Sequence, residues 1–207
     1  MNRLRQRKSK PWASCVVLPA SLALIISSGC NSGVHTSRAD RRTLLGMAVL
    51  PMGNPKRQTL DDVENALEQT FKLSVIELKG VDMLKSAYYS PRSRYRAEKI
   101  MVSAPKVGLS KVIVVTDKDI STPAHGHEDY GIMGLGQLGG ANCVVSSFRA
   151  RRQIGKTAVH EIGHTLGLPH CPDAKCIMVD GKGKGLMPDS SSKFCAKCTG
   201  KIRQWLN

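Results

Sequence analysis

Three histidines and one glutamate within eleven residues constrain this 207-residue chain more than any other feature. His160, Glu161, His164, Gly167 and His170 form the pattern HExxHxxGxxH. On an α-helix, His160 and His164 lie one turn apart on the same face, where two imidazoles can share a metal ion. Gly167 can end the helix in a left-handed conformation, and the chain then reverses to bring His170 to the same ion. The pattern therefore predicts a helix, a tight turn and a three-histidine metal site.

The chemistry of such a site follows from the one coordination position of the metal ion that three histidines leave open. Three neutral imidazoles leave one position of a tetrahedral zinc ion open to water, which is typical of catalytic rather than structural zinc. Glu161 is not needed as a ligand, and a carboxylate beside the metal can act as general base on that water. We therefore predict a zinc-dependent hydrolase of amide bonds, with Glu161 as the catalytic residue and the histidines as metal ligands.

Four cysteines form a second group, which begins directly after the last histidine. They follow the pattern C-x4-C-x18-C-x2-C and are Cys171, Cys176, Cys195 and Cys198. Four thiolates suit a closed structural zinc site. Two disulfides are the alternative in an oxidising compartment, but the closing CxxC spacing favours a metal. We predict two zinc ions per chain, one catalytic and one structural.

The first thirty residues are typical of an export signal. Five basic residues and no acidic residue precede an uncharged run from Trp12 to Ser28, as in a secretory signal. Cys30 follows small residues and resembles the lipidated cysteine of a bacterial lipoprotein; plain secretion and a retained anchor are the alternatives. We expect a signal peptide over residues 1–29, a tether over 30–43 and a folded domain over 44–207. The protein would be exported and held in the cell envelope by lipid, or secreted.

The pattern of apolar residues in the folded part predicts a mixed α/β domain. Apolar runs predict strands over residues 44–50, 73–78, 112–116 and 142–148. Helical spacing predicts a helix over 60–72 that starts with a capping box of Thr59 and Asp62, and a second over 93–103 capped by Ser93. Residues 81–92 are expected to form a loop. This order of strands and helices is typical of a mostly parallel sheet with helices packed on it.

The two motifs together resemble the archaemetzincins, a family of metzincin zinc peptidases. The resemblance lies in Cys171 directly after the histidines, in Met178 two residues after Cys176, and in the closing CxxC, and it extends over residues 44–200. It implies a metzincin-like domain divided by an active-site cleft, with Met178 as the Met-turn residue under the histidines. It also implies that the glycine-rich residues 131–140 include an antiparallel edge strand that pairs with the substrate backbone. From the residues alone, this stretch is equally typical of a flexible hairpin.

Charge and aromatic content indicate whether nucleic acid is a partner of the protein. The chain has a formal charge of +15, and residues 30–207 keep +10 after five basic residues are removed with the signal. Such charge favours anionic surroundings, but two Trp, four Tyr and three Phe offer few side chains for base stacking, so we expect no nucleic-acid partner. We interpret Arg149, Arg151, Arg152 and Lys156 as a solvated face. The predicted function is a zinc metallopeptidase acting on peptides or proteins; the alternatives are an envelope amidase and a non-catalytic zinc-binding module.

Overall fold

The computed structural model of the protein describes residues 46–108, 111–181, 188 and 191–206. The predicted signal peptide, the tether and Cys30 lie outside these residues, as do Leu44 and Leu45 of the first predicted strand. None of the described helices is long and apolar enough to cross a membrane. The described residues all belong to one unit, Thr36–Asn207.

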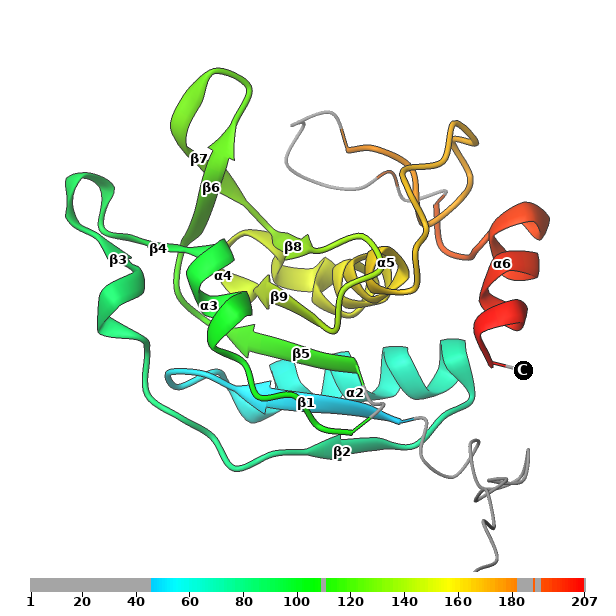
Figure 1. The fold of residues 1–207 in the computed structure, drawn as a ribbon, viewed down its shortest axis with the longest axis horizontal. Coiled ribbons are helices and arrows are strands. Elements are labelled where there is room, and N and C mark those ends of the chain that lie inside the picture. Colours follow the sequence, from blue (N-terminus) through cyan, green and yellow to red (C-terminus); the bar gives the residue numbers. More distant parts are fainter. Residues whose placement is uncertain (1–45, 109–110, 182–187, 189–190, 207) are drawn as a thin grey trace, which may run out of the picture. The chain divides into compact units, whose positions relative to one another are not determined.

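Five strands form the main sheet, in the order β2-β1-β5-β9-β8 (Figure 1). The parallel strands are β1 (Met47–Pro51), β2 (Val75–Glu77), β5 (Lys111–Thr116) and β9 (Asn142–Ser146). At one edge, β8 (Gly134–Gly136) runs antiparallel to β9. The predicted α/β architecture, a mostly parallel sheet with an antiparallel edge strand, is confirmed.

The parallel strands are apolar along their whole length because both faces of the sheet are covered. In β1, Met47 and Val49 belong to one core cluster, whereas Ala48 and Leu50 belong to a second. Helices α2 (Arg57–Phe71) and α5 (Ile154–Thr165) contribute to the first cluster, and α3 (Ala97–Ser103) contributes to the second. The last helix, α6 (Ala196–Leu206), joins the first cluster through Ile202.

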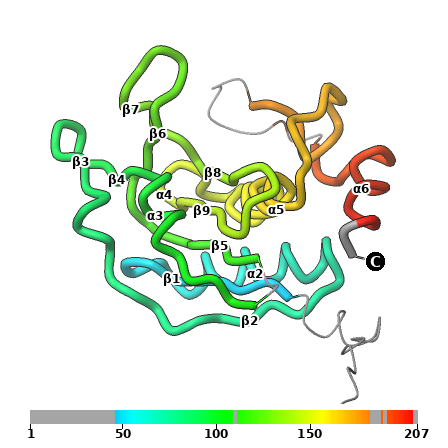
Figure 2. Tube along the Cα trace, viewed as in Figure 1, coloured from blue at the N-terminus to red at the C-terminus, as the bar shows by residue number. Residues whose placement is uncertain are grey.

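The path into α5 fixes the position of the histidine motif. From β9 the chain passes through the short α4 (Ser147–Ala150) and the 3₁₀ turn η3 (Arg151–Gln153) into α5, as the tube in Figure 2 shows. Ser146 caps α4, because its hydroxyl accepts a hydrogen bond from the Phe148 N–H at 3.1 Å. Helix α5 packs on β9 and β8, so that the histidine helix lies against the edge of the sheet.

A second sheet of four strands is not predicted by the sequence. Its order is β3-β4-β6-β7, formed by β3 (Tyr88–Tyr89), β4 (Arg94–Arg96), β6 (Ile120–Ala124) and β7 (His127–Ile132). Ion pairs hold it together: Arg94 donates to Asp119 at 2.8 Å and to Asp129 at 3.0 Å. These partners are 25 and 35 residues away in sequence, so no local pattern indicates them.

The start of α2 differs from the prediction. The helix begins at Arg57 rather than residue 60, and its N-cap, Lys56, has no side-chain capping bond. The predicted capping box of Thr59 and Asp62 is therefore wrong. Asp62 lies within the first turns of the helix and accepts a hydrogen bond from Gln58 at 2.8 Å.

The helix predicted from Ser93 begins four residues later, at Ala97. Ser93 has a φ of 51° and ends the 3₁₀ turn η2 (Ser90–Arg92), and the next residues form β4 instead of a helical turn. Pairing of β4 with β3 and β6 overrides the local helical spacing. Residues 81–92, expected as a loop, include η2, β3 and a further turn, η1 (Lys85–Ala87).

Candidate metal centres

The structure brings the three predicted histidines together at the end of α5. His160 and His164 project from consecutive turns, and the centroids of their rings lie 4.7 Å apart. The helix ends at Thr165, Gly167 adopts the left-handed conformation with φ of 82°, and the Leu168 N–H returns to the Gly163 carbonyl at 3.0 Å. This turn places the centroid of the His170 ring 5.4 Å from that of the His160 ring and 4.9 Å from that of the His164 ring.

Backbone carbonyls fix the orientation of two of these rings. The Nδ1 atom of His160 lies 2.7 Å from the Ile177 carbonyl oxygen, and that of His164 lies 2.8 Å from the Leu168 carbonyl oxygen. Because a carbonyl oxygen only accepts hydrogen bonds, each Nδ1 carries the proton and each Nε2 is left with a lone pair. Burial lowers the pKa of His160 to about 4 and also lowers the pKa of His164. Both imidazoles are therefore neutral at pH 7.

The two Nε2 atoms provide a test of whether this group fits a metal ion. They lie 3.1 Å apart, a separation at which two lone pairs repel each other unless they share a cation. Nitrogen ligands 2.0–2.1 Å from a tetrahedral zinc ion are about 3.3–3.4 Å from each other. Ligand atoms of all three histidines lie within 4.8 Å of one another. The histidine cluster thus fits zinc in both chemistry and spacing.

The predicted catalytic residue, Glu161, is buried between α5 and β8. A Cβ built on Gly134 would lie 2.7 Å from the Glu161 Cγ, so the edge strand touches this side chain directly. The carboxylate accepts a hydrogen bond from the Gly136 backbone N–H, which lowers its pKa. Burial acts more strongly and raises the pKa of Glu161 to about 8.

Met178 lies on the opposite side of the same helix turn. It is fully buried, and a Cβ built on Gly163 would lie 2.4 Å from its sulfur atom. Its carbonyl oxygen accepts a hydrogen bond from the Cys171 N–H at 2.7 Å. Met178 therefore contacts the histidine helix and is bonded to the cysteine segment.

The four predicted cysteines also meet in space. Their sulfur atoms lie within 4.8 Å of one another, and all four thiols are free. The Sγ atoms of Cys171 and Cys195 are 3.8 Å apart, which equals the separation of about 3.8 Å expected for two thiolates 2.3 Å from one tetrahedral zinc ion. Hydrogen bonding, chiefly from the Cys198 backbone, lowers the pKa of Cys195 to about 7. This group fits a structural zinc better than it fits two disulfides.

Some residues of the histidine site belong to no motif in the sequence. Asp180 places a carboxylate oxygen 3.9 Å from Nδ1 of His170; its position two residues after Met178 is the only local signal. The Ile177 and Leu168 carbonyls orient the His160 and His164 rings only because the fold brings them there. Gly134 and Gly136 lie in the stretch noted for its glycines, but their contact with Glu161 is visible only in the structure.

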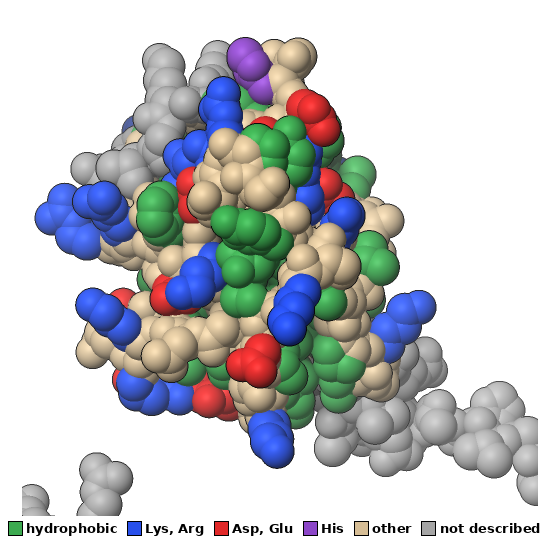
Figure 3. All heavy atoms as spheres, turned by 90° about the vertical axis from the view of Figure 1, so that its left-hand side faces the viewer, with side chains coloured by type: hydrophobic (Ala, Val, Ile, Leu, Met, Phe, Trp, Pro, Cys, Tyr) green, Lys and Arg blue, Asp and Glu red, His purple; other side chains and the backbone are tan. Residues whose placement is uncertain are grey.

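The four basic residues at and just before the start of α5 are only partly the solvated face that the sequence suggested. Arg149 donates to Asp119 at 2.6 and 2.8 Å and is part of the network that holds the second sheet. Lys156 donates to the Pro188 carbonyl. On the face of the molecule that carries the second sheet, Figure 3 shows Lys and Arg side chains scattered among acidic and apolar ones rather than gathered in one patch.

The fold and the histidine helix together define a zinc metallopeptidase. Residues 150–204 match the family model described as peptidase family M54. The archaemetzincin of Archaeoglobus fulgidus is 31% identical over 153 residues, which cover 70% of this chain and 91% of that protein. That of Haloarcula marismortui is 29% identical over 148 residues, or 63% of this chain and 83% of the relative. The chain belongs to the archaemetzincin family.

Solved structures agree with this assignment. The crystal structure of the Archaeoglobus fulgidus archaemetzincin, complexed with malonate, superposes with a TM-score of 0.61 at 29% identity and covers 75% of this chain and 99% of its own. The archaemetzincin from Methanopyrus kandleri superposes with the same TM-score at 23% identity, and covers 77% of this chain and 94% of its own. The second likeness supports the fold alone.

Proposed function

We propose that the protein hydrolyses peptide bonds with Glu161 as general base, beside a zinc ion held by His160, His164 and His170. The observation that carries this proposal is the pair of unprotonated Nε2 atoms 3.1 Å apart, on a helix whose intervening carboxyl group is buried against the edge strand. A purely structural role for the histidines would not explain why the carboxyl group of Glu161 is buried beside them. Burying a carboxyl group costs free energy, and among the described residues no ion pair with Glu161 compensates that cost.

Zinc in such a site supplies a Lewis acid that activates water and polarises the scissile carbonyl. Glu161 takes a proton from the attacking water and passes one to the leaving amine, so that one water and one peptide bond give one carboxylic acid and one amine. Burial makes the carboxylate a stronger base, and a neighbouring cation favours its ionised form at neutral pH. The Gly136 N–H holds the carboxylate in place during both transfers.

The protein's own groups orient the proposed ligands. The carbonyls of Ile177 and Leu168 hold the His160 and His164 rings in one tautomer, as is usual around metal-binding imidazoles. Asp180 is the corresponding group near His170. Loss of such partners typically lowers metal affinity about 10- to 100-fold.

We propose that the cysteine cluster holds a second, structural zinc ion. This ion would tie the segment after His170, which contains Cys171 and Cys176, to the start of α6, which contains Cys198. Ile177 and Met178 follow Cys176 directly. A zinc ion here would therefore fix the loop that supplies the carbonyl partner of His160.

We propose that the substrate binds as an extended strand along β8. This strand pairs with β9 on one side only and is the edge of the main sheet. Its backbone groups can therefore pair with a peptide by β-augmentation. Because β8 also contacts Glu161, a strand bound here lies beside the proposed base.

Export to the cell envelope, with lipidation of Cys30 or with secretion, is likewise a proposal and rests on the sequence of residues 1–30. Mass spectrometry of the mature N-terminus in membrane and soluble fractions tests it. A chain that begins at Cys30 with added acyl mass supports the anchored form, and an intact Met1 in the soluble fraction contradicts export.

Digestion of a mixed peptide library tests the catalytic proposal. The zinc-loaded full chain is compared with Glu161→Gln, and with the exposed Glu68→Gln as matched control. Cleavage by the parent and the control, with loss in Glu161→Gln at equal zinc content, supports the mechanism. Equal turnover by all three proteins rejects Glu161 as the base.

A further inference from the structure

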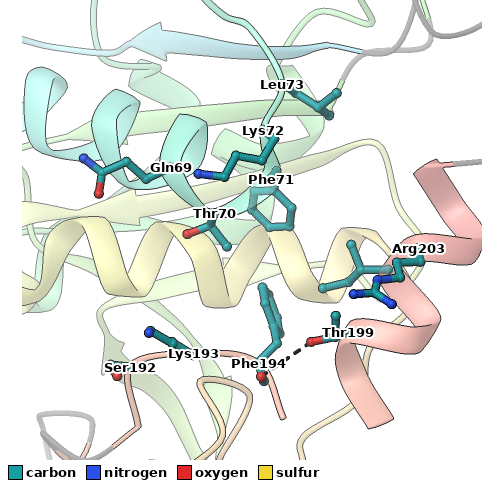
Figure 4. A pocket seen from close by; sticks show the side chains of 11 residues that line it. Gln69, Thr70, Phe71, Lys72, Leu73, Ser192, Lys193, Phe194, Thr199 and Arg203 are labelled. Carbon is teal, nitrogen blue, oxygen red and sulfur yellow. Dashed lines mark hydrogen bonds between the residues drawn. The ribbon is translucent and has the colours of Figure 1, made fainter. Parts of the chain in front are cut away.

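A groove separate from the histidine cluster lies between the end of α2, the segment before Cys195, and α6 (Figure 4). Its volume is about 860 Å³, within the range of sites that hold small ligands. None of the three histidines and none of the four cysteines lines it. The proposed peptidase function therefore does not account for this groove.

The floor of the groove is apolar. The rings of Phe71 and Phe194 lie 5.8 Å apart and face the groove from α2 and from the segment before α6. Leu73 and Ile202 add further apolar surface to the lining. Such a floor favours a ligand with an apolar body.

Three basic side chains stand around this floor: Lys72, Lys193 and Arg203. The lining includes no acidic residue, and within the described part of the chain none of the three has an ion-pair or hydrogen-bond partner. The carbonyl end of α2 contributes about half a negative charge. Three full positive charges outweigh it, so the groove attracts an anion.

The charge of the chain itself narrows the choice of occupant. Residues 31–45, which precede β1, contain Arg38, Arg41 and Arg42 against the single acidic residue Asp40, so this segment would meet like charge in the groove. A second copy of the chain would also bring positive charge. The lining comes from helix ends and a loop and offers no strand edge for an extended peptide. A free small molecule fits these features best.

We infer that the groove between α2 and α6 binds a small amphiphile in which one carboxylate is attached to an apolar chain. The chain lies on the two phenylalanine rings, and the carboxylate pairs with Lys193 or with Arg203, which stand on opposite sides of the Phe194 ring (Figure 4). The inference does not rest on the proposed peptidase activity.

One wall of the groove connects it to the histidine cluster. The Lys193 carbonyl accepts a hydrogen bond from the Ile177 N–H at 2.8 Å. The Ile177 carbonyl in turn accepts from Nδ1 of His160 at 2.7 Å. A molecule in the groove therefore contacts the segment that orients one proposed zinc ligand.

Titration calorimetry of the zinc-loaded full chain with octanoate tests the inference, with octanol and octyltrimethylammonium as probes of the same length. We expect octanoate to bind at least tenfold more tightly than either. Affinity should rise about three- to fourfold for each added methylene and fall with added salt. Amide resonances of Phe194 and Thr199 should shift with octanoate. Equal affinity for octanol, no binding, or shifts confined to other residues overturns the inference.

A pair of variants separates the groove from the general positive charge of the surface. The double variant Lys193→Gln with Arg203→Gln should weaken octanoate binding at least tenfold. Lys201→Gln removes a charge from the same helix, outside the groove, and should change affinity less than twofold. If the double variant binds like the parent, or if both proteins lose the same affinity, the groove is not the site.

Discussion

Replacement of Gly136 by alanine tests how closely the edge strand packs against the catalytic helix. An alanine Cβ at this position would lie 2.5 Å from the Glu161 carbonyl oxygen and 3.1 Å from the His164 Cβ. Ordinary contacts begin at 3.4 Å, so β8 must move by about 0.9 Å, because the helix backbone cannot yield locally. The displaced N–H of residue 136 is the group that holds the Glu161 carboxylate.

The expected cost has two parts. Overpacking of this kind typically lowers the free energy of unfolding by about 1–3 kcal/mol. A displacement of about 1 Å in a catalytic group can lower turnover about 100-fold. We therefore expect a lower urea midpoint and a kcat for peptide cleavage reduced by about 10- to 100-fold, with zinc content unchanged.

Gly200→Ala provides the matched control. Gly200 lies within α6, and outside its own helix no atom of the described residues stands within 4 Å of its added Cβ. Alanine favours a helix by up to about 1 kcal/mol over glycine, so this variant should be slightly more stable and equally active. If Gly136→Ala has the urea midpoint and the kcat of the parent, β8 does not position Glu161.

Three further predictions follow from packing and charge. Gly155→Ala should lower the free energy of unfolding by about 1–3 kcal/mol in urea titrations, because its Cβ would lie 2.7 Å from the Asp62 carbonyl oxygen and 2.8 Å from the Ala66 Cβ; an unchanged midpoint argues against this helix contact. With the histidine site emptied by a chelator and the cysteine site loaded, Glu161→Gln should be more stable than the parent by about 3 kcal/mol at pH 7. Burial raises the pKa of Glu161 from 4.5 to about 8, so the parent loses stability as pH rises between these values; the two proteins should unfold alike below pH 4.5, and a constant difference across pH contradicts the assignment. Cys198→Ser should reduce zinc, measured by elemental analysis, from two ions per chain to one and lower stability by several kcal/mol; two ions retained would show that this thiol is not a ligand.

The histidine and cysteine groups could be predicted because their geometry is local. His160 and His164 meet on any regular α-helix, and Gly167 supplies the one backbone conformation that returns the chain to His170. The apolar runs of β1, β5 and β9 likewise indicate strands covered on both faces. For these elements, a few consecutive residues carry the whole signal.

The rest depends on partners that are distant in sequence. The second sheet has strands as short as β3, with two residues, and is held by Arg94 reaching Asp119 and Asp129. Pairing within this sheet makes residues 94–96 a strand, although their spacing in the sequence predicts a helix. No spacing in the sequence shows that Gly134 and Gly136 face Glu161, because the contact joins β8 to α5.

Diffraction at the zinc absorption edge from crystals of the full chain tests directly whether the histidine and cysteine clusters each bind zinc. We expect two anomalous peaks, one from a zinc ion bound by His160, His164 and His170 and the other from a zinc ion bound by the four cysteine sulfur atoms. Glu161 should bind neither ion. A histidine cluster without zinc at saturating metal, or cysteines joined as two disulfides, would contradict it.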